Sequence, residues 1–195
     1  MDATLRDHAL LGLRAVVGGS LAAHGAQKLF GAFGGGGPES TAKAFEEHMH
    51  LEPGEAMARL AGGTELGSGL ATALGVGGPI GPTAMAATMT VAALTAHRGK
   101  PYFGQMGGPE MPLLYAANGA FLALAGFGRD SLDRGMGLRV PKSIGVVHAA
   151  LAAAAAAAIV SRAWRAQDAA NAQPRAAVDE HEPEQPQARL QARGA

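Results

Sequence analysis

The stretch that decides the fold is residues 10–30, LLGLRAVVGGSLAAHGAQKLF. It is apolar along most of its length apart from Arg14, and it has roughly the 20 residues that a helix needs to cross about 30 Å of hydrocarbon. Its far end is polar, because His24, Gln27 and Lys28 fall within one and a half turns of that helix. A polar side chain without a partner is costly inside a bilayer and is usually kept for a purpose. The stretch therefore predicts both a membrane helix and a place where chemistry could occur.

Four further apolar segments follow, at residues 57–76, 80–97, 111–127 and 144–164. Long stretches inside the first four segments, residues 15–23, 66–78, 83–96 and 113–127, carry no charged residue, whereas a soluble helical bundle would show charges along one face of each helix. The sequence thus favours an all-α integral membrane bundle of four transmembrane helices over a soluble, alanine-rich bundle. A fifth, C-terminal helix is also predicted, and its alanine run at 149–158 fits either a further span or a helix packed at the surface.

The composition excludes several classes of function. The chain has 195 residues, 16 basic and 16 acidic side chains, and no cysteine. A neutral balance gives no basic surface for nucleic acid. Without cysteine there is no thiolate nucleophile and no cysteine-ligated iron–sulfur cluster. Any redox role would therefore depend on a bound cofactor or a partner chain.

We divide the chain into a membrane domain at residues 1–134, an additional helix at 135–165 and a polar tail at 166–195. The tail is rich in Gln, Glu, Pro, Ala and Arg and has few large apolar side chains, which is typical of a disordered segment. The first apolar segment does not resemble a cleavable signal peptide, because its positive n-region is weak and it contains His24 and Lys28.

Basic residues in the short loops predict the orientation. The densest group between two segments lies between the fourth and the fifth, at Arg129, Arg134, Arg139 and Lys142. The positive-inside rule places that loop in the cytoplasm. Four crossings separate it from the N-terminus, so we expect a multi-pass protein of the bacterial inner membrane with a cytoplasmic N-terminus. A spanning fifth segment would put the arginines of the tail on the outside, which conflicts with the same rule.

Three more polar residues lie inside or at the ends of apolar segments. Glu65 lies within the second segment, His97 ends the third, and Glu110 stands just before the fourth. Counting crossings puts all three toward the membrane face that also holds the polar end of residues 10–30. Glu65 must be protonated, paired or facing water. The structural alternative for it is a salt bridge with Lys28, Arg14 or Arg59 that fixes helix packing.

Close helix contact is expected beside Glu65. Gly63 and Gly67 have the small-xxx-small spacing that lets two helix backbones approach. On a helix, Glu65 lies about 200° away from the Gly63–Gly67 face, so it is expected to point elsewhere.

Two histidines and two carboxylates at one membrane face suit either metal binding or proton transfer. No HExxH or His-x-His spacing supports a metal, and no metal ligand is predicted. A quinone takes up protons together with electrons and would use such donors at its carbonyl oxygens. The proposed catalytic proton carriers are Glu65 and His97. The proposed cofactor-binding residues are His24, Gln27, Lys28 and Glu110. The structural alternative for the first motif is an interfacial cap, in which Lys28 snorkels to the head groups.

At these residues the chain resembles the DoxX family of small bacterial membrane proteins. The matching motifs are His24-Gly25-Ala26-Gln27-Lys28-Leu29-Phe30-Gly31, the Gly-Gly-Thr-Glu-Leu-Gly stretch around Glu65, His97, Glu110 with Pro112-Leu113-Leu114, and Gly126-Phe127-Gly128-Arg129-Asp130-Ser131-Leu132-Asp133. The resemblance covers about residues 8–134. It implies a four-helix membrane domain and a link to redox chemistry, since relatives include the membrane subunit of thiosulfate:quinone oxidoreductase. The additional fifth segment, the tail and the lack of cysteine depart from that picture and argue against direct sulfur chemistry.

The leading hypothesis is a quinone- or small-redox-molecule-binding component of a membrane oxidoreductase system. Its partners would be the lipid bilayer and a soluble redox protein, with no nucleic acid. The second hypothesis is a non-catalytic membrane scaffold that anchors soluble redox enzymes, so the sequence leaves open whether the chain is an enzyme. A small-solute transporter would need polar groups on both faces of the bundle, and the one-sided distribution argues against it.

Overall fold

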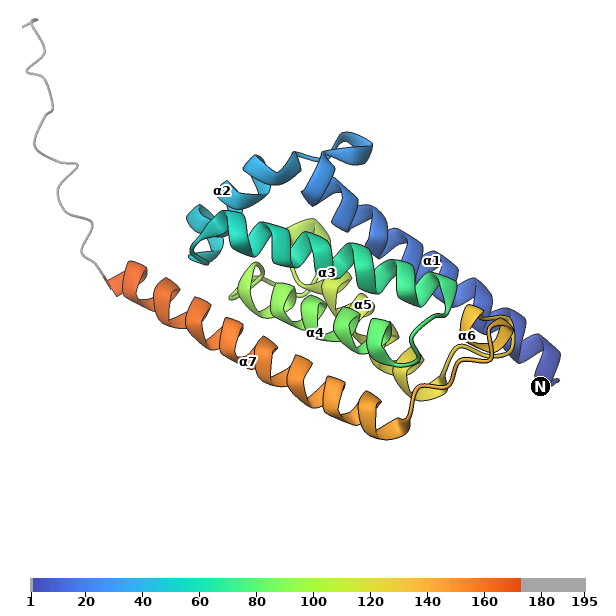
Figure 1. Cartoon of the computed structure of the whole chain (residues 1–195). Helices are drawn as coiled ribbons and strands as arrows, with labels where there is room; N and C mark the ends of the chain where they lie inside the picture. Colours follow the sequence, from blue (N-terminus) through green and yellow to red (C-terminus); the bar gives the residue numbers. More distant parts are fainter. Residues whose placement is uncertain (1, 173–195) are drawn as a thin grey trace, which may run out of the picture.

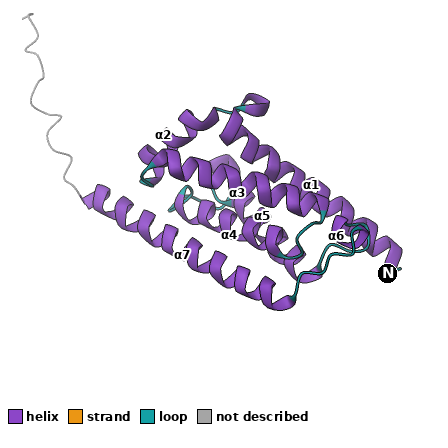
Figure 2. Ribbon diagram, in the orientation of Figure 1, coloured by secondary structure: helices purple, strands orange, loops and turns teal. Residues whose placement is uncertain are grey.

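The structure is a computed structural model that describes residues 2–172, and these residues form helices and loops without a strand (Figures 1 and 2). The prediction of an all-α protein is confirmed. Each of the five predicted segments is a helix: α1 (Ala3–Phe30), α3 (Gly54–Leu74), α4 (Ile80–Thr95), α5 (Glu110–Ala125) and α7 (Lys142–Ala172). Two shorter helices were not predicted, α2 (Gly37–Met49) and α6 (Leu132–Gly135).

Helix α7 extends into the segment that the sequence assigns to the tail. Residues 166–172 belong to α7, so the first part of the segment assigned to the tail is helical. The rest of the predicted tail, residues 173–195, lies outside the described residues.

Successive long helices run in alternating directions, which gives the bundle two distinct ends (Figure 1). One end holds the start of α1, the α3–α4 turn, α6 and the start of α7. The opposite end, which we call the α2 end, holds the end of α1, α2, the start of α3, the α4–α5 loop and the end of α7.

The most extensive contact in the bundle joins α1 to α3 through glycines. A Cβ atom on Gly18 would lie 2.6 Å from the carbonyl oxygen of Gly69, and one on Gly25 would lie 2.6 Å from that of Gly62. Such distances leave no room for a side chain, so the two backbones touch directly. The glycines are seven residues apart on each helix, a spacing that keeps them on one face of a helix.

The expected close contact at Gly63 and Gly67 is wrong. An added Cβ atom would meet nothing within 4 Å at either position, so both glycines face away from the neighbouring helices. The contact uses Gly62 and Gly69 instead. Glu65 lies between these two on the buried face of α3, and it therefore points into the α1–α3 contact.

The turn between α3 and α4 is held by Asp133 of α6. Its carboxylate accepts hydrogen bonds from the backbone N–H groups of Gly77 (2.9 Å) and Gly78 (2.7 Å). The backbone N–H of Asp133 in turn donates to the carbonyl of Gly75 (3.0 Å). Gly75 ends α3 with φ of 68°, a conformation that glycine adopts without steric cost. Asp133 thus ties the loop after α5 to the tight α3–α4 hairpin.

Helix α7 lies parallel to α4 and is fixed to it at both ends (Figure 1). Near its start, His148 Nδ1 lies 2.7 Å from Thr83 Oγ1. Near its end, the indole N–H of Trp164 donates to the Leu94 carbonyl (2.7 Å), and Asp168 pairs with Arg98 (2.8 Å). The additional helix is therefore a packed part of the bundle.

Two helices, α1 and α7, are long and apolar enough to cross a membrane, by length and composition. At 1.5 Å per residue, the 16-residue helices α4 and α5 reach only about 24 Å, which is less than the roughly 30 Å hydrocarbon core. The predicted count of four spans is therefore not confirmed by helix length. Helix α7, whose alanine run fits either a further span or a surface helix, is the more apolar of the two candidate spans: an 18-residue window of it has a mean hydropathy of 2.1, against 1.2 for one in α1.

The first prediction concerns the glycine contact. Gly18→Ala should destabilise the protein by about 1–3 kcal/mol, because the new methyl group must push α1 away from α3. The neighbouring Gly19→Ala is the matched control, since its Cβ would meet nothing within 4 Å and alanine favours the helix. Unfolding midpoints of the purified protein in detergent measure the difference. Equal effects of the two substitutions would contradict the packing described.

The second prediction concerns the hairpin clamp. Asp133→Ala should cost about 3 kcal/mol of stability, because two backbone N–H groups lose a charged acceptor. The exposed Glu39→Gln substitution in α2 serves as a charge control and should change stability by no more than about 0.5 kcal/mol. The same unfolding measurement applies. An Asp133→Ala variant with unchanged stability would show that the turn forms without the hydrogen bonds of the Asp133 carboxylate.

Candidate functional site

The polar end of α1 is built around an ion pair with α3. Lys28 Nζ lies 2.5 Å from Glu65 Oε2, and the Glu65 side chain is only 4% exposed while that of Lys28 is 29% exposed. The close glycine contact places the two residues opposite each other at the same level of the bundle. Of the three partners considered for Glu65, the structure selects Lys28. The pair gives the carboxylate the counter-charge that a buried acid requires.

One turn earlier on α1, His24 faces α5. Its Nδ1 lies 3.1 Å from Gln27 Oε1, and its ring stands edge-on to Tyr115, with 6.1 Å between ring centroids. The hydroxyl groups of Tyr115 and Ser20 lie 2.5 Å apart. Ser20 and His24 are exposed, whereas Tyr115 is buried in the core beside Leu21 of α1 and Met85 and Met89 of α4. We call the set of six side chains the α1 polar cluster: Ser20, His24, Gln27, Lys28, Glu65 and Tyr115.

His97 and Glu110 lie at the same end of the bundle but bond to the α4–α5 loop. His97 Nδ1 lies 2.7 Å from the carbonyl oxygen of Gly107, and Glu110 Oε2 accepts from the N–H of Gly104 (2.8 Å). Among the described residues, no hydrogen bond or ion pair joins either side chain to the α1 polar cluster. Of the six residues predicted from the sequence, four thus belong to the α1 polar cluster, and the other two, His97 and Glu110, bond to the α4–α5 loop.

The α1 polar cluster offers donors, acceptors and one charge pair, but no metal site. Within residues 2–172, no group of three or more His, Asp or Glu side chains is arranged to hold a metal ion. Hydroxyl, imidazole, amide and ammonium groups can bind a carbonyl oxygen, and the carboxylate can exchange a proton with the ammonium. The arrangement therefore suits binding and proton transfer.

A second buried cation lies at the opposite end of the bundle. Arg14 is 2% exposed, donates to the carbonyl oxygen of Asp130, and stands over the ring of Phe127 at 5.8 Å from its centroid. It fastens the loop after α5 to α1, close to the Asp133 clamp. The sequence shows this residue as a lone arginine in an apolar segment, and the structure assigns it to packing.

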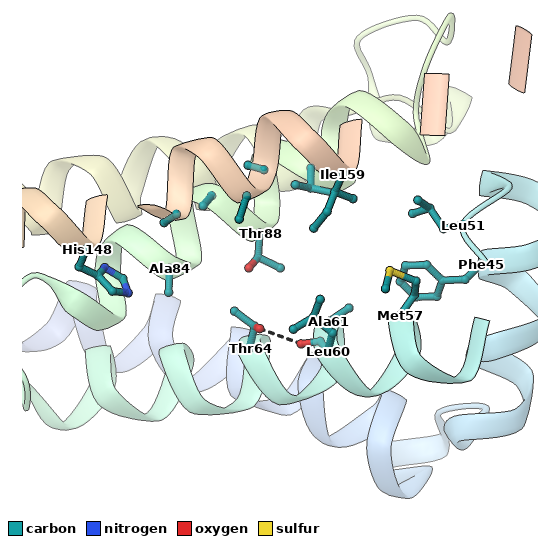
Figure 3. A pocket seen from close by; sticks show the side chains of 15 residues that line it. Phe45, Leu51, Met57, Leu60, Ala61, Thr64, Ala84, Thr88, His148 and Ile159 are labelled. Atoms are coloured by element: carbon teal, nitrogen blue, oxygen red, sulfur yellow. Dashed lines mark hydrogen bonds between the residues drawn. The ribbon is translucent and has the colours of Figure 1, made fainter. Parts of the chain in front are cut away.

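A separate apolar cavity of about 260 Å³ lies between α3, α4 and α7 (Figure 3). Its polar lining consists of Thr64, Thr88 and His148. A larger, more open groove of about 750 Å³ lies on the other side of α7, against α4 and α5. None of the six residues predicted from the sequence lines either space.

Sequence reasoning missed three residues that the structure brings into play. Ser20 and Tyr115 complete the α1 polar cluster from within apolar segments, and His148 lines the cavity. Each is an isolated polar residue in an apolar segment, which is the signal that singled out Glu65. The two hydroxyl groups are a weak signal in the sequence, because Ser and Tyr are tolerated in apolar helices far more readily than charged residues.

The helical bundle and its two long apolar helices are those of a membrane protein. Residues 9–98, from α1 to just past the end of α4, match the model of the DoxX family, so the resemblance is confirmed over these residues. The match ends before Glu110 and the Gly126–Asp133 motif. No curated protein and no solved structure matches the chain.

The third prediction concerns the buried ion pair. Lys28→Met should destabilise the protein by about 3 kcal/mol, because it leaves the Glu65 carboxylate buried without a counter-charge. Adding Glu65→Leu should recover most of that loss, since the buried charge is then gone. The exposed Glu55–Arg59 pair is the matched control, and Arg59→Met should cost no more than about 0.5 kcal/mol. Unfolding in detergent measures Lys28→Met, Glu65→Leu, the double variant and Arg59→Met, and strictly additive losses for Lys28→Met and Glu65→Leu would contradict the pairing.

Proposed function

We propose that this DoxX-like protein is a multi-pass membrane component that binds a small redox molecule of the quinone type at the α1 polar cluster. The observation that carries the proposal is the exposed imidazole of His24 beside a buried ion pair and a pair of hydroxyl groups. Inside a membrane, exposed polar groups on a helix call for a partner, and a ligand carbonyl supplies one.

The contacts support distinct roles within the cluster. His24, Gln27 and the Ser20–Tyr115 hydroxyls can donate hydrogen bonds to a carbonyl oxygen. Glu65 and Lys28 share a short hydrogen bond, so after Lys28 delivers its proton to the ligand, Glu65 can take up a proton from water and pass it to the neutral amine of Lys28. His97 and Glu110 would enter the site only by giving up their bonds to the loop, and we propose them as residues at its mouth.

The proposed orientation in the membrane rests on the basic residues of the chain. The segment between α5 and α7 carries Arg129, Arg134, Arg139 and Lys142. Placed in the cytoplasm by the positive-inside rule, this segment puts the N-terminus in the cytoplasm as well and the α2 end on the other side. The α1 polar cluster would then open toward the outer face of the membrane.

The second candidate function is a scaffold that anchors soluble redox enzymes. The observation that favours it is that Lys28, Glu65, His97 and Glu110 each have a structural partner. Gentle extraction separates the two functions, because a scaffold should bring down a soluble redox protein and carry no quinone, whereas a binding component should carry quinone.

The fourth prediction tests the site. Purified protein in lipid nanodiscs should bind decylubiquinone, and His24→Phe should weaken that binding about tenfold, the value of one hydrogen bond. Glu65→Gln should retain binding but slow quinone reduction by a reduced partner, because an amide cannot take up a proton and pass it to Lys28. The exposed His48→Phe in α2 is the matched control and should bind as the unmodified protein does.

Two outcomes would overturn the proposal. Full binding and turnover by both Glu65→Gln and His97→Ala would show that Glu65 as proton carrier and His97 as a residue at the mouth of the site are wrongly assigned. Failure of the unmodified protein to bind the quinone in nanodiscs, while a soluble partner copurifies, would favour the scaffold.

A further inference from the structure

The cavity between α3, α4 and α7 has a single imidazole at one end. His148 also lines a second hollow of about 360 Å³ with Ser143, Ile144, Val147 and Leu151, so it stands where two spaces along α7 meet. Figure 3 shows its ring directed from α7 toward the space beside Ala84. The Thr64 hydroxyl at the middle of the cavity donates to the Leu60 carbonyl (2.7 Å) and is thereby satisfied.

Hydrogen bonding fixes the proton on the His148 ring. The Thr83 hydroxyl lies 2.8 Å from the Pro79 carbonyl oxygen, which can only accept, so its single proton is directed there. We infer that Thr83 Oγ1 then accepts from His148 Nδ1, 2.7 Å away. A neutral ring that carries its proton on Nδ1 has a lone pair on Nε2. His148 Nε2 makes no hydrogen bond to another described residue and is therefore a free acceptor.

The shape of the cavity fits an extended chain. Its α7 lining runs from His148 to Ile159, which is roughly 16 Å along a helix that rises 1.5 Å per residue. The lining between these two residues is alanine, and Phe45 and Met57 lie at the far end (Figure 3). The space is thus long, narrow and mostly apolar, with the His148 acceptor at one end and the hydroxyl-bearing side chains of Thr64 and Thr88 along its length.

We propose that this cavity binds a neutral single-chain amphiphile whose hydroxyl head group donates a hydrogen bond to His148 Nε2 and whose apolar chain runs toward Phe45. An ionised carboxylate head can only accept and finds no donor on this tautomer. An ether or ester head lacks the proton and leaves Nε2 unpaired. The cavity therefore favours a head group that donates a hydrogen bond, because a bound ligand without a donor leaves the Nε2 acceptor of His148 unpaired, which costs free energy.

This site is independent of the α1 polar cluster. None of the six cluster residues lines the cavity, and Glu65 faces α1 while its neighbour Thr64 faces α7. Failure of one proposal therefore leaves the other untouched.

The test uses two probes that differ in one proton, 4-nonylphenol and its methyl ether, with the full-length protein in lipid nanodiscs. The phenol should bind about tenfold more tightly than the ether, and His148→Phe should abolish that preference. Thr83→Val keeps the imidazole but removes the acceptor of its Nδ1 proton, and it should reduce the preference. Ala155→Leu should weaken binding of both probes by filling the cavity, and the exposed Ala154→Leu, which lines no cavity described here, is its matched control.

Each remaining outcome overturns the proposal. Equal affinity for the phenol and the ether would mean that the cavity binds an apolar chain without a hydrogen bond to its head group. A preference that survives His148→Phe would place the acceptor elsewhere. Binding unaffected by Ala155→Leu would place the ligand outside the cavity.

Discussion

The direct backbone contact between α1 and α3 is the constraint on which the rest of the structure depends. Glycines on both helices bring the two axes so close that Lys28 and Glu65 meet across the contact at 2.5 Å. With the glycine face of α3 turned to α1, its opposite face is turned to α4 and α7, and Thr64 lines the cavity there. Helix α3 thus separates the charged α1 polar cluster from the neutral cavity. Small residues make both sites possible, because glycines let α1 and α3 touch and the alanines of α7 leave space between α7 and its neighbours.

The sequence predicted the helices well because their physical cause is local. Length and the absence of charge suffice to find the five long helices, and the DoxX motif in α1 suffices to find the family. Helix α2 was missed although Pro38 stands in its first turn and Glu39 follows, which are ordinary signals for a helix start. This stretch is polar and only 13 residues long, so the length and apolar character that identify a membrane span do not find it.

Contacts between helices were harder to predict, because they depend on which face of each helix turns inward. The spacing rule favoured Gly63 and Gly67, but the contact uses Gly62 and Gly69, one or two positions away. A shift of one residue turns a helix by about 100°, and this shift moves Glu65 from the outside of the contact to its centre. The pairing of Glu65 with Lys28 was among the predicted alternatives, whereas the separate bonding of His97 to its loop depends on the path of that loop, which no periodicity encodes.

The additional helix changes what the DoxX-like region can hold. Alanine favours helix formation but fills little volume, so α7 packs on α4 through a few larger residues at its ends and leaves spaces on both sides between them. Leucine at the same positions would have closed those spaces and increased the buried apolar surface. Trp164 and His148, at opposite ends of the alanine run, fix the helix by hydrogen bonds that require little packing. Because α7 is fixed at its ends and packs loosely along its middle, space remains between α7 and the neighbouring helices. The small side chains of the alanine run keep that space open to an apolar chain.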